Sequence, residues 1–78
     1  MAEDHDIEVG KIQKNATEEI HVLARRYKGY RFIDLRIRAQ NNAGEMVPTV
    51  KGLAVKPEDA GALINLIQEA AQKIEELG

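Results

Sequence analysis

Apolar and polar residues alternate most regularly between residues 30 and 38, which predicts a β-strand with one buried face. Ile33, Leu35 and Ile37 share one side of such a strand, because successive side chains point to opposite faces. We expect that side to face the hydrophobic core. The residues on the opposite side are Tyr30, Phe32, Asp34, Arg36 and Arg38.

Four other segments are rich in branched or alternating residues and predict further, shorter strands. Lys28-Gly29 predicts a tight turn, because glycine tolerates a positive φ, and residues 41–44 predict a hairpin loop. The basic stretch 11–17 reads as a connection. Pro48 lacks the N–H that a central strand requires, so its strand should lie at an edge or carry a bulge. The four segments are 7–12, 19–25, 45–50 and 53–55.

Residues 57–78 predict one amphipathic helix. Pro57 suits the first helical position, and the acids Glu58 and Asp59 complement the positive end of the helix dipole. Apolar residues then recur every three or four positions as far as Leu77, a stripe broader than one small sheet would cover. We therefore expect the helices of two copies to pack together in a homodimer. The expected interface residues are Leu63, Leu66, Ile67, Ala70 and Ile74.

The chain of 78 residues is long enough for one domain only. A domain of this size buries only about 60% of its unfolded surface, so its core is small. Cysteine is absent, which excludes disulfides and thiolate metal sites and leaves self-association as the expected source of extra stability. We predict an α+β domain over residues 9–78, with an antiparallel sheet followed by a C-terminal helix, after a flexible acidic segment over residues 1–8.

No apolar run approaches the length of a membrane span, and the first residues are acidic, unlike the basic start of a secretion signal. We expect a cytoplasmic protein with no membrane partner, associated with the nucleoid if its source is bacterial.

The net charge of −2 conceals an uneven distribution, because residues 9–56 carry ten bases and four acids while acids dominate both ends. Six of the eleven bases lie between residues 25 and 38, beside all three aromatic residues, Tyr27, Tyr30 and Phe32. Cations neutralise phosphates and rings stack on unpaired bases, so this stretch predicts a surface for single-stranded nucleic acid. From the stretch alone, a half-buried strand with a basic solvated side is an equally good interpretation.

Few residues could support catalysis. His21 has no second histidine or cysteine at ligand spacing, and a lone strand histidine is usually an ordinary sheet residue. Glu18 and Glu19 would point to opposite faces of a strand and cannot form a carboxylate pair. Asp34 reads as a charge partner for Arg36 or a cross-strand cation. With no serine, cysteine or phosphate-binding glycine motif either, we expect no enzyme, no metal, no cofactor and no small-molecule substrate.

Seven short motifs span the chain from about residue 8 to its end. They are Gly10-Lys11, Tyr27-Lys28-Gly29, Ile33-Asp34-Leu35-Arg36, Gly44-Glu45-Met46, Pro48, Lys51-Gly52-Leu53 and Pro57-Glu58. Each motif is unspecific alone. In their order and spacing they resemble the single-stranded nucleic-acid-binding domain of the positive cofactor four transcriptional coactivators and of their short bacterial relatives.

This resemblance implies a four-stranded, strongly curved antiparallel sheet followed by one helix, in a homodimer formed largely through the helices. It also implies grooves for single-stranded DNA, with RNA and melted duplex as further candidates. By position, the family's binding surface corresponds to Lys11, Arg25, Tyr27, Lys28, Tyr30, Arg36 and Lys51. Positive charge alone adds Arg26, Arg31 and Arg38.

The sequence departs from the family in ways that bear on affinity. Ala39 stands near the position where eukaryotic members carry tryptophan, which removes one stacking platform, and the residues before Lys51 are not basic. We predict a homodimeric accessory factor of transcription or DNA metabolism that binds single-stranded DNA without sequence preference. The alternative, from another class, is a protein-interaction module whose basic sheet docks an acidic partner.

Overall fold

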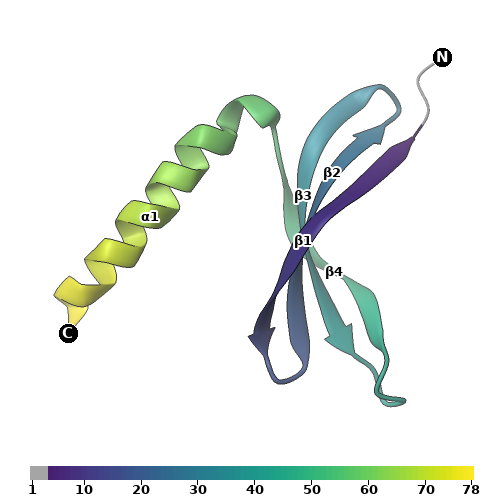
Figure 1. Ribbon diagram of the computed structural model, residues 1–78, viewed down its shortest axis with the longest axis horizontal. Helices are drawn as coiled ribbons and strands as arrows, with labels where there is room; N and C mark the ends of the chain where they lie inside the picture. Colours follow the sequence, from purple (N-terminus) through teal and green to yellow (C-terminus); the bar gives the residue numbers. More distant parts are fainter. Residues whose placement is uncertain (1–3) are drawn as a thin grey trace.

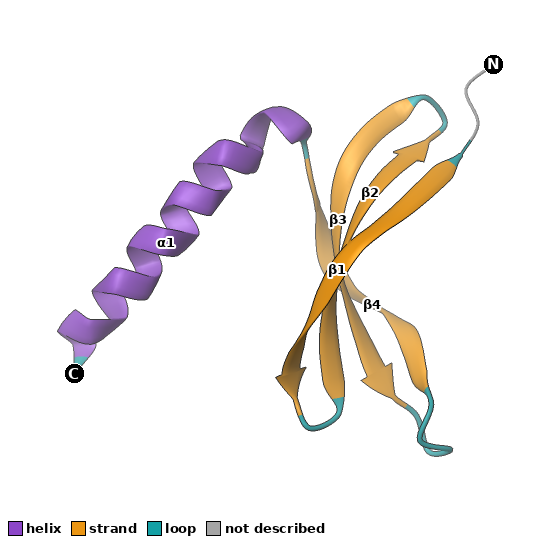
Figure 2. Cartoon of the chain, viewed as in Figure 1, coloured by secondary structure: helices purple, strands orange, loops and turns teal. Residues whose placement is uncertain are grey.

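The computed structural model describes residues 4–78, so the first three residues of the expected acidic segment 1–8 lie outside it. Four long strands form one antiparallel sheet in chain order, and a single helix follows (Figure 1 and Figure 2). This confirms the predicted α+β class and the four-stranded sheet. The elements are β1 (His5–Asn15), β2 (Glu18–Tyr27), β3 (Tyr30–Gln40), β4 (Met46–Val55), the 3₁₀-helix η1 (Pro57–Asp59) and α1 (Ala60–Leu77).

The first strand is longer than the sequence predicts. β1 begins at His5, so residues 5–8 belong to the sheet instead of a loose acidic end, and it continues to Asn15 through the stretch expected to be a connection. Its pairing with β2 shifts register after Glu8 and again after Gln13. A bulge interrupts the alternation of side chains, which explains why the hydrophobic pattern underestimates this strand.

The turn between β2 and β3 has two residues, as predicted. Lys28 has a φ of 51° and Gly29 a φ of 84°. Two consecutive positive φ angles characterise the tight turns whose twist matches that of the flanking strands. The turn holds Tyr27 and Tyr30 directly opposite each other as the last pair of the hairpin.

The two short strands predicted after residue 44 are one edge strand, β4, with an irregularity in the middle. Pairing with β3 jumps from Arg38 opposite Pro48 to Arg36 opposite Gly52, so the proline lies in an irregular edge strand as predicted. Gly52 has a φ of 147°, and a Cβ atom on it would overlap the carbonyl oxygen of Leu35. Only glycine therefore lets β4 pass this close to β3.

The apolar side of the sheet faces the first half of α1, as the alternation in β3 predicts. A cavity of about 250 Å³ remains between them, lined by Val22, Ile33, Leu35, Val55, Ala60, Leu63, Ile64 and Ile67. Val55, which is 8% exposed, is the only buried hydrophobic side chain within residues 4–78. The second half of α1 extends away from the sheet (Figure 1). Among the described residues, no helix combines the length and the hydrophobicity needed to cross a membrane.

The folded chain is unusually open for its size. It exposes 6362 Å², whereas a compact monomer of 8.7 kDa exposes about 4,700 Å². Its radius of gyration is 15.1 Å, compared with about 11.5 Å for a compact domain of this length. A single copy therefore leaves much apolar surface in water.

Candidate nucleic-acid interface

The side of the sheet that points away from α1, here called the polar face, carries exposed rings at one end. Tyr27 and Tyr30 are cross-strand partners and are 47% and 76% exposed. The Lys28 ammonium lies 5.4 Å from the centre of the Tyr27 ring, within the range of a cation–π contact. We call these three residues the ring end. Its two aromatic faces and one cation are open to solvent.

A buried carboxylate lies at the centre of the polar face. Asp34 is only 2% exposed, and its two oxygens accept hydrogen bonds from Arg25 Nη1 and Arg36 Nη2, each at 2.9 Å. The prediction that Asp34 is a charge partner of Arg36 or of a cross-strand cation is confirmed, and Asp34 pairs with both. Removing a carboxylate from water is costly unless it is paired and hydrogen-bonded. This arrangement fixes the two guanidinium groups on either side of Asp34.

Arg25 is held from three directions. Its Nε atom donates a hydrogen bond of 2.8 Å to Asp6 Oδ1 from β1, and its guanidinium carbon lies 5.6 Å from the centre of the Phe32 ring. The hydrogen bonds to Asp6 and Asp34 raise the pKa of Arg25 above its usual value. Arg25 is therefore a rigid cation whose charge is largely offset by neighbouring acids.

The other end of the polar face contains an acidic cluster that the sequence analysis missed. His21 is buried, and its two ring nitrogens contact Glu8 and Glu19, the latter at 2.9 Å. The hydrogen bond with His21 lowers the pKa of both carboxyl groups. Glu19 also pairs with Lys11 at 3.4 Å. A strand prediction that included residues 5–8 would have placed Asp6 beside Arg25 and Glu8 beside His21.

The structure brings together seven of the ten residues predicted to bind nucleic acid. Six lie on the polar face by strand alternation and pairing, and Lys28 lies in the turn at its edge. Arg38 is half-buried and makes no ion pair with residues in the described part of the chain. The six are Lys11, Arg25, Tyr27, Tyr30, Arg36 and Arg38.

Three predicted residues do not join this surface. Arg26 and Arg31 pair with each other across β2 and β3, and alternation places both on the side that faces α1. Grouping them with Arg25 by charge alone ignored this alternation. Lys51 lies in the irregular part of β4 and contacts Glu18 at 3.9 Å. Glu18 lies on the same side of the sheet as Ile20, which is the side that faces α1. Lys51 is therefore also directed away from the polar face.

The polar face is less positive than the sequence suggests. Asp6, Glu8, Glu19 and Asp34 lie among its cations, and three of these acids come from β1 or its immediate partner. The ring end and Arg38 are the parts where positive charge is not directly paired with a side-chain carboxylate among residues 4–78. Although Glu8, His21 and Glu19 are in contact, no group of three or more histidine, cysteine or acidic side chains within residues 4–78 is arranged so that it could hold a metal ion.

Comparison with known proteins identifies the family. A family model described as Transcriptional Coactivator p15 (PC4) matches residues 14–66, which is more than half of the chain. The chain belongs to this family. The matched range of this PC4-family protein includes the ring end and the Arg25–Asp34–Arg36 cluster. Asp6, Glu8 and Lys11 lie outside it. No curated protein matches the sequence.

Solved structures of a PC4 homologue from Burkholderia pseudomallei K96243 share the fold. Its orthorhombic crystal form aligns with a TM-score of 0.78 at 30% identity, covering 94% of this chain and 99% of the homologue. Its tetragonal form gives a TM-score of 0.75, also at 30% identity, over 86% and 98% of the two chains. Family and fold together support a nucleic-acid-binding, coactivator-type role for the PC4-family chain.

Proposed function

We propose that this PC4-family protein is a homodimer that binds single-stranded DNA on its polar face without sequence preference, and that it is not an enzyme. The observation that carries the proposal is the ring end: two exposed tyrosines held opposite each other beside a lysine. Rings presented in this way stack on bases that are unpaired, and each stacked base contributes about 1–3 kcal/mol. Paired bases are already stacked in a duplex, so the site favours single strands.

The remaining cations supply attraction to the phosphates. Arg25 and Arg36 are 32% and 29% exposed, so each guanidinium can still meet a phosphate while Asp34 fixes its orientation. Arg38 adds a cation that is free of an ion pair within the described range. None of these contacts reads a base edge, which is why we propose binding without sequence preference. Affinity should fall steeply as salt is added.

Dimerisation is supported by the apolar surface that one copy leaves exposed. Leu66, Ile67 and Ile74 on α1 are 62%, 57% and 62% exposed. The exposed area exceeds that of a compact monomer by roughly 1,700 Å², and a standard interface buries about 800 Å² per partner. A second copy packed on α1 would remove this surface from water. Of the interface residues predicted from sequence, Leu66, Ile67, Ala70 and Ile74 are exposed, whereas Leu63 is half-buried and lines the cavity between α1 and the sheet.

A fluorescent oligo-dT titration tests the function directly. We expect binding at low salt that weakens at high salt, and at least about tenfold weaker binding when Tyr27 and Tyr30 are both changed to alanine. The Tyr27→Phe, Tyr30→Phe variant keeps the rings and should bind almost as well as the wild type. Lys73→Ala removes a cation from α1, away from the polar face, and should leave binding almost unchanged if the attraction to phosphates is local to that face.

Other outcomes would point elsewhere. Equal affinity of the wild type and the double alanine variant would dismiss the stacking role. No binding at low salt, together with retention of a purified acidic protein, would favour the interaction-module alternative. Equal affinity for a duplex of the same length would remove the preference for single strands.

A further inference from the structure

A depression of about 460 Å³ lies beside the ring end, where β3 passes the 3₁₀-helix η1. β4 stops pairing with β3 where Val55 lies opposite Ile33, and the chain then enters η1 at Pro57. Proline has no N–H and cannot extend a ladder of strand hydrogen bonds. The first residues of β3 therefore have no strand beside them on this side within the described range, and the depression opens there.

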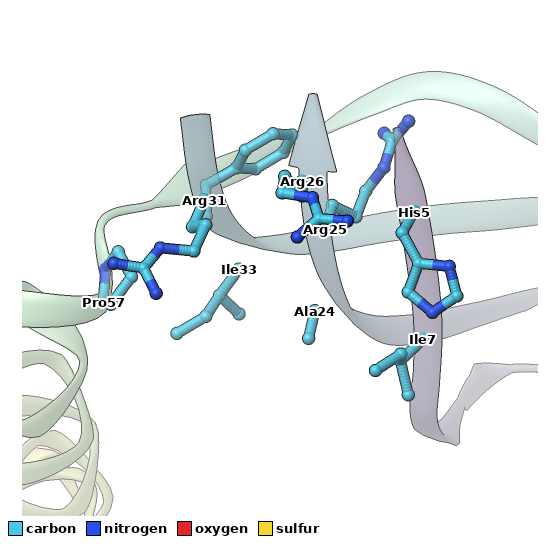
Figure 3. Close-up of a pocket in the computed structure, with 9 residues that line it drawn as sticks. His5, Ile7, Ala24, Arg25, Arg26, Arg31, Ile33 and Pro57 are labelled. Atoms are coloured by element: carbon cyan, nitrogen blue, oxygen red, sulfur yellow. The ribbon is translucent and has the colours of Figure 1, made fainter. Parts of the chain in front are cut away.

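Two side chains of opposite charge border this depression. Figure 3 shows the Arg31 side chain extending toward Pro57. Arg31 and Glu58 are both exposed, and neither forms an ion pair with a residue in the described range 4–78. The cation and the carboxylate are therefore both available to a ligand. The lining residues are Gly29, Tyr30, Arg31, Pro57 and Glu58.

The depression is continuous with the ring end, because Tyr30 belongs to both. Its volume lies within the range of about 300–1,000 Å³ that small-ligand sites occupy, so it has room for one base. Unpaired bases are recognised by stacking on aromatic side chains and by hydrogen bonds to their edges. A base that stacks on Tyr30 brings its edges close to Arg31 and Glu58.

The chemistry of base edges selects guanine for this position. A carboxylate only accepts hydrogen bonds, and a guanidinium only donates them. Guanine carries two adjacent donors, N1–H and the N2 amino group, and two adjacent acceptors, O6 and N7, so it matches a carboxylate on one edge and a guanidinium on the next. Thymine offers one donor between two carbonyl oxygens, which repel a carboxylate. Adenine has an amino group beside N7, where the guanidinium requires a second acceptor.

We propose that the depression is a guanine subsite, in which Glu58 accepts hydrogen bonds from N1 and N2 of an unpaired guanine and Arg31 donates to its O6 and N7. This inference rests on the binding of single strands proposed above. It adds a preference at one position of the strand, next to a polar face whose contacts are indifferent to sequence. It also gives Arg31 a nucleic-acid contact that is separate from that face.

Fluorescence titration of the full-length protein with four oligonucleotides of equal length tests the subsite. We expect alternating d(TG) to bind about five- to tenfold more tightly than oligo-dT, because a bidentate base contact discriminates by about that factor or more. Alternating d(TA) controls for purine stacking and should bind within about twofold of oligo-dT. Alternating d(TI), whose inosine lacks the N2 amino group, should lie between d(TG) and d(TA).

Variants assign the preference to the depression. Glu58→Ala should reduce the ratio of d(TG) affinity to oligo-dT affinity to below about twofold, and Arg31→Ala should lower this ratio as well. The ratio is the readout because the loss of an acid, by itself, raises both affinities by the same factor. Asp59→Ala removes the neighbouring acid of η1, which does not line the depression, and should keep the wild-type ratio.

Each remaining outcome overturns a defined claim. Wild-type protein that binds none of the oligonucleotides would overturn the proposed function, and the subsite with it. Equal binding of d(TG), d(TA) and oligo-dT by the wild type would overturn the subsite alone. A guanine preference that persists in Glu58→Ala, or that Asp59→Ala lowers to the same extent, would also overturn it, because the depression would not be the source of the preference.

Discussion

The polar face of the sheet and the helix α1 differ in how far their side chains find partners within one copy of the chain. On the polar face, the buried carboxylate of Asp34 is satisfied inside the chain, since it accepts hydrogen bonds from two arginines. No buried side-chain nitrogen or oxygen in the described residues lacks a hydrogen-bond partner. On α1 no residue is buried at all, although an apolar stripe runs along its length. The polar face is complete in a single copy, whereas α1 leaves its apolar stripe uncovered.

This difference indicates that the polar face suits ligand binding, whereas the apolar stripe of α1 suits a packing contact. A surface whose charges are already paired can stay ordered while it is open to a ligand, because the ligand need not order the side chains first. An exposed apolar stripe gains free energy only when it is covered. Four experiments can break or sharpen this comparison.

The largest effect is expected on the helix. Leu66→Glu places a charge in the proposed interface, and burying two unpaired carboxylates per dimer should weaken association at least about a hundredfold. Because covering α1 would stabilise the fold, the variant should also melt at a lower temperature that no longer depends on protein concentration. Sedimentation velocity and thermal melts at several concentrations measure both effects.

A matched control adds the same charge to the opposite side of the helix. Gln68→Glu lies about 160° away from Leu66 around the axis, so it should leave the dimer intact. Equal behaviour of the two variants would contradict the assignment of the stripe as the interface.

The next effect is expected at the centre of the polar face. Asp34→Asn leaves Arg25 and Arg36 without their shared carboxylate and should lower the free energy of unfolding by about 2 kcal/mol, less than for a fully buried pair because both arginines are partly exposed. Urea denaturation measures the change. Asp6→Asn removes an exposed acid from the same Arg25 and should cost less than about 1 kcal/mol. Equal losses would mean that burial of Asp34 is not what matters.

These two regions also show what a sequence can disclose. The alternation of Ile33, Leu35 and Ile37 predicted the side of β3 that faces the helix, and the glycine and proline positions predicted the turn and the irregular edge strand. These features depend on local sequence. The extent of β1 does not, because two bulges break its pattern and its partners lie on another strand.

In the candidate site too, features formed by residues close in the sequence were predicted, and features formed by pairing between distant residues were not. The ring end follows from residues that are close in the sequence, and Asp34 was predicted as an arginine partner because arginines flank it. The Glu8–His21–Glu19 cluster joins residues up to thirteen positions apart and required the β1–β2 register. Arg26 and Arg31 were misplaced because charge was counted without regard to strand alternation. The contacts that could not be predicted are therefore those that depend on pairing between residues far apart in the sequence.

Acid should weaken the far end of the polar face first. The hydrogen bonds with His21 lower the pKa of Glu8 and Glu19 below the ordinary value of 4.5. A carboxyl whose pKa is lower in the folded state contributes stability above its unfolded pKa, and that contribution is lost as the pH falls through the folded pKa. The melting temperature should therefore be steady near neutral pH and decline below about pH 4.5.

Variants identify the groups responsible for this decline. Glu8→Gln, Glu19→Gln protein should melt lower than the wild type at neutral pH and lose less on acidification, because it has given up the titrating groups. Glu45→Gln removes an exposed acid of the loop and should keep the wild-type pH profile. An identical decline in all three proteins would show that other carboxyl groups govern acid unfolding.

The smallest effect concerns competition on the polar face. Asp6 Oδ1 accepts a hydrogen bond from Arg25 Nε at 2.8 Å, so a phosphate approaching Arg25 meets a carboxylate that is already there. Asp6→Asn should raise affinity for oligo-dT about two- to fivefold at low salt, and the gain should shrink at high salt where charges are screened. Fluorescence titration at the two salt concentrations measures it. Glu69→Gln makes the same change in net charge on α1 and should leave affinity nearly unchanged. If both variants gained equally, net charge and not the Asp6–Arg25 contact would control binding, and the polar face would be no more specific for phosphate than the rest of the surface.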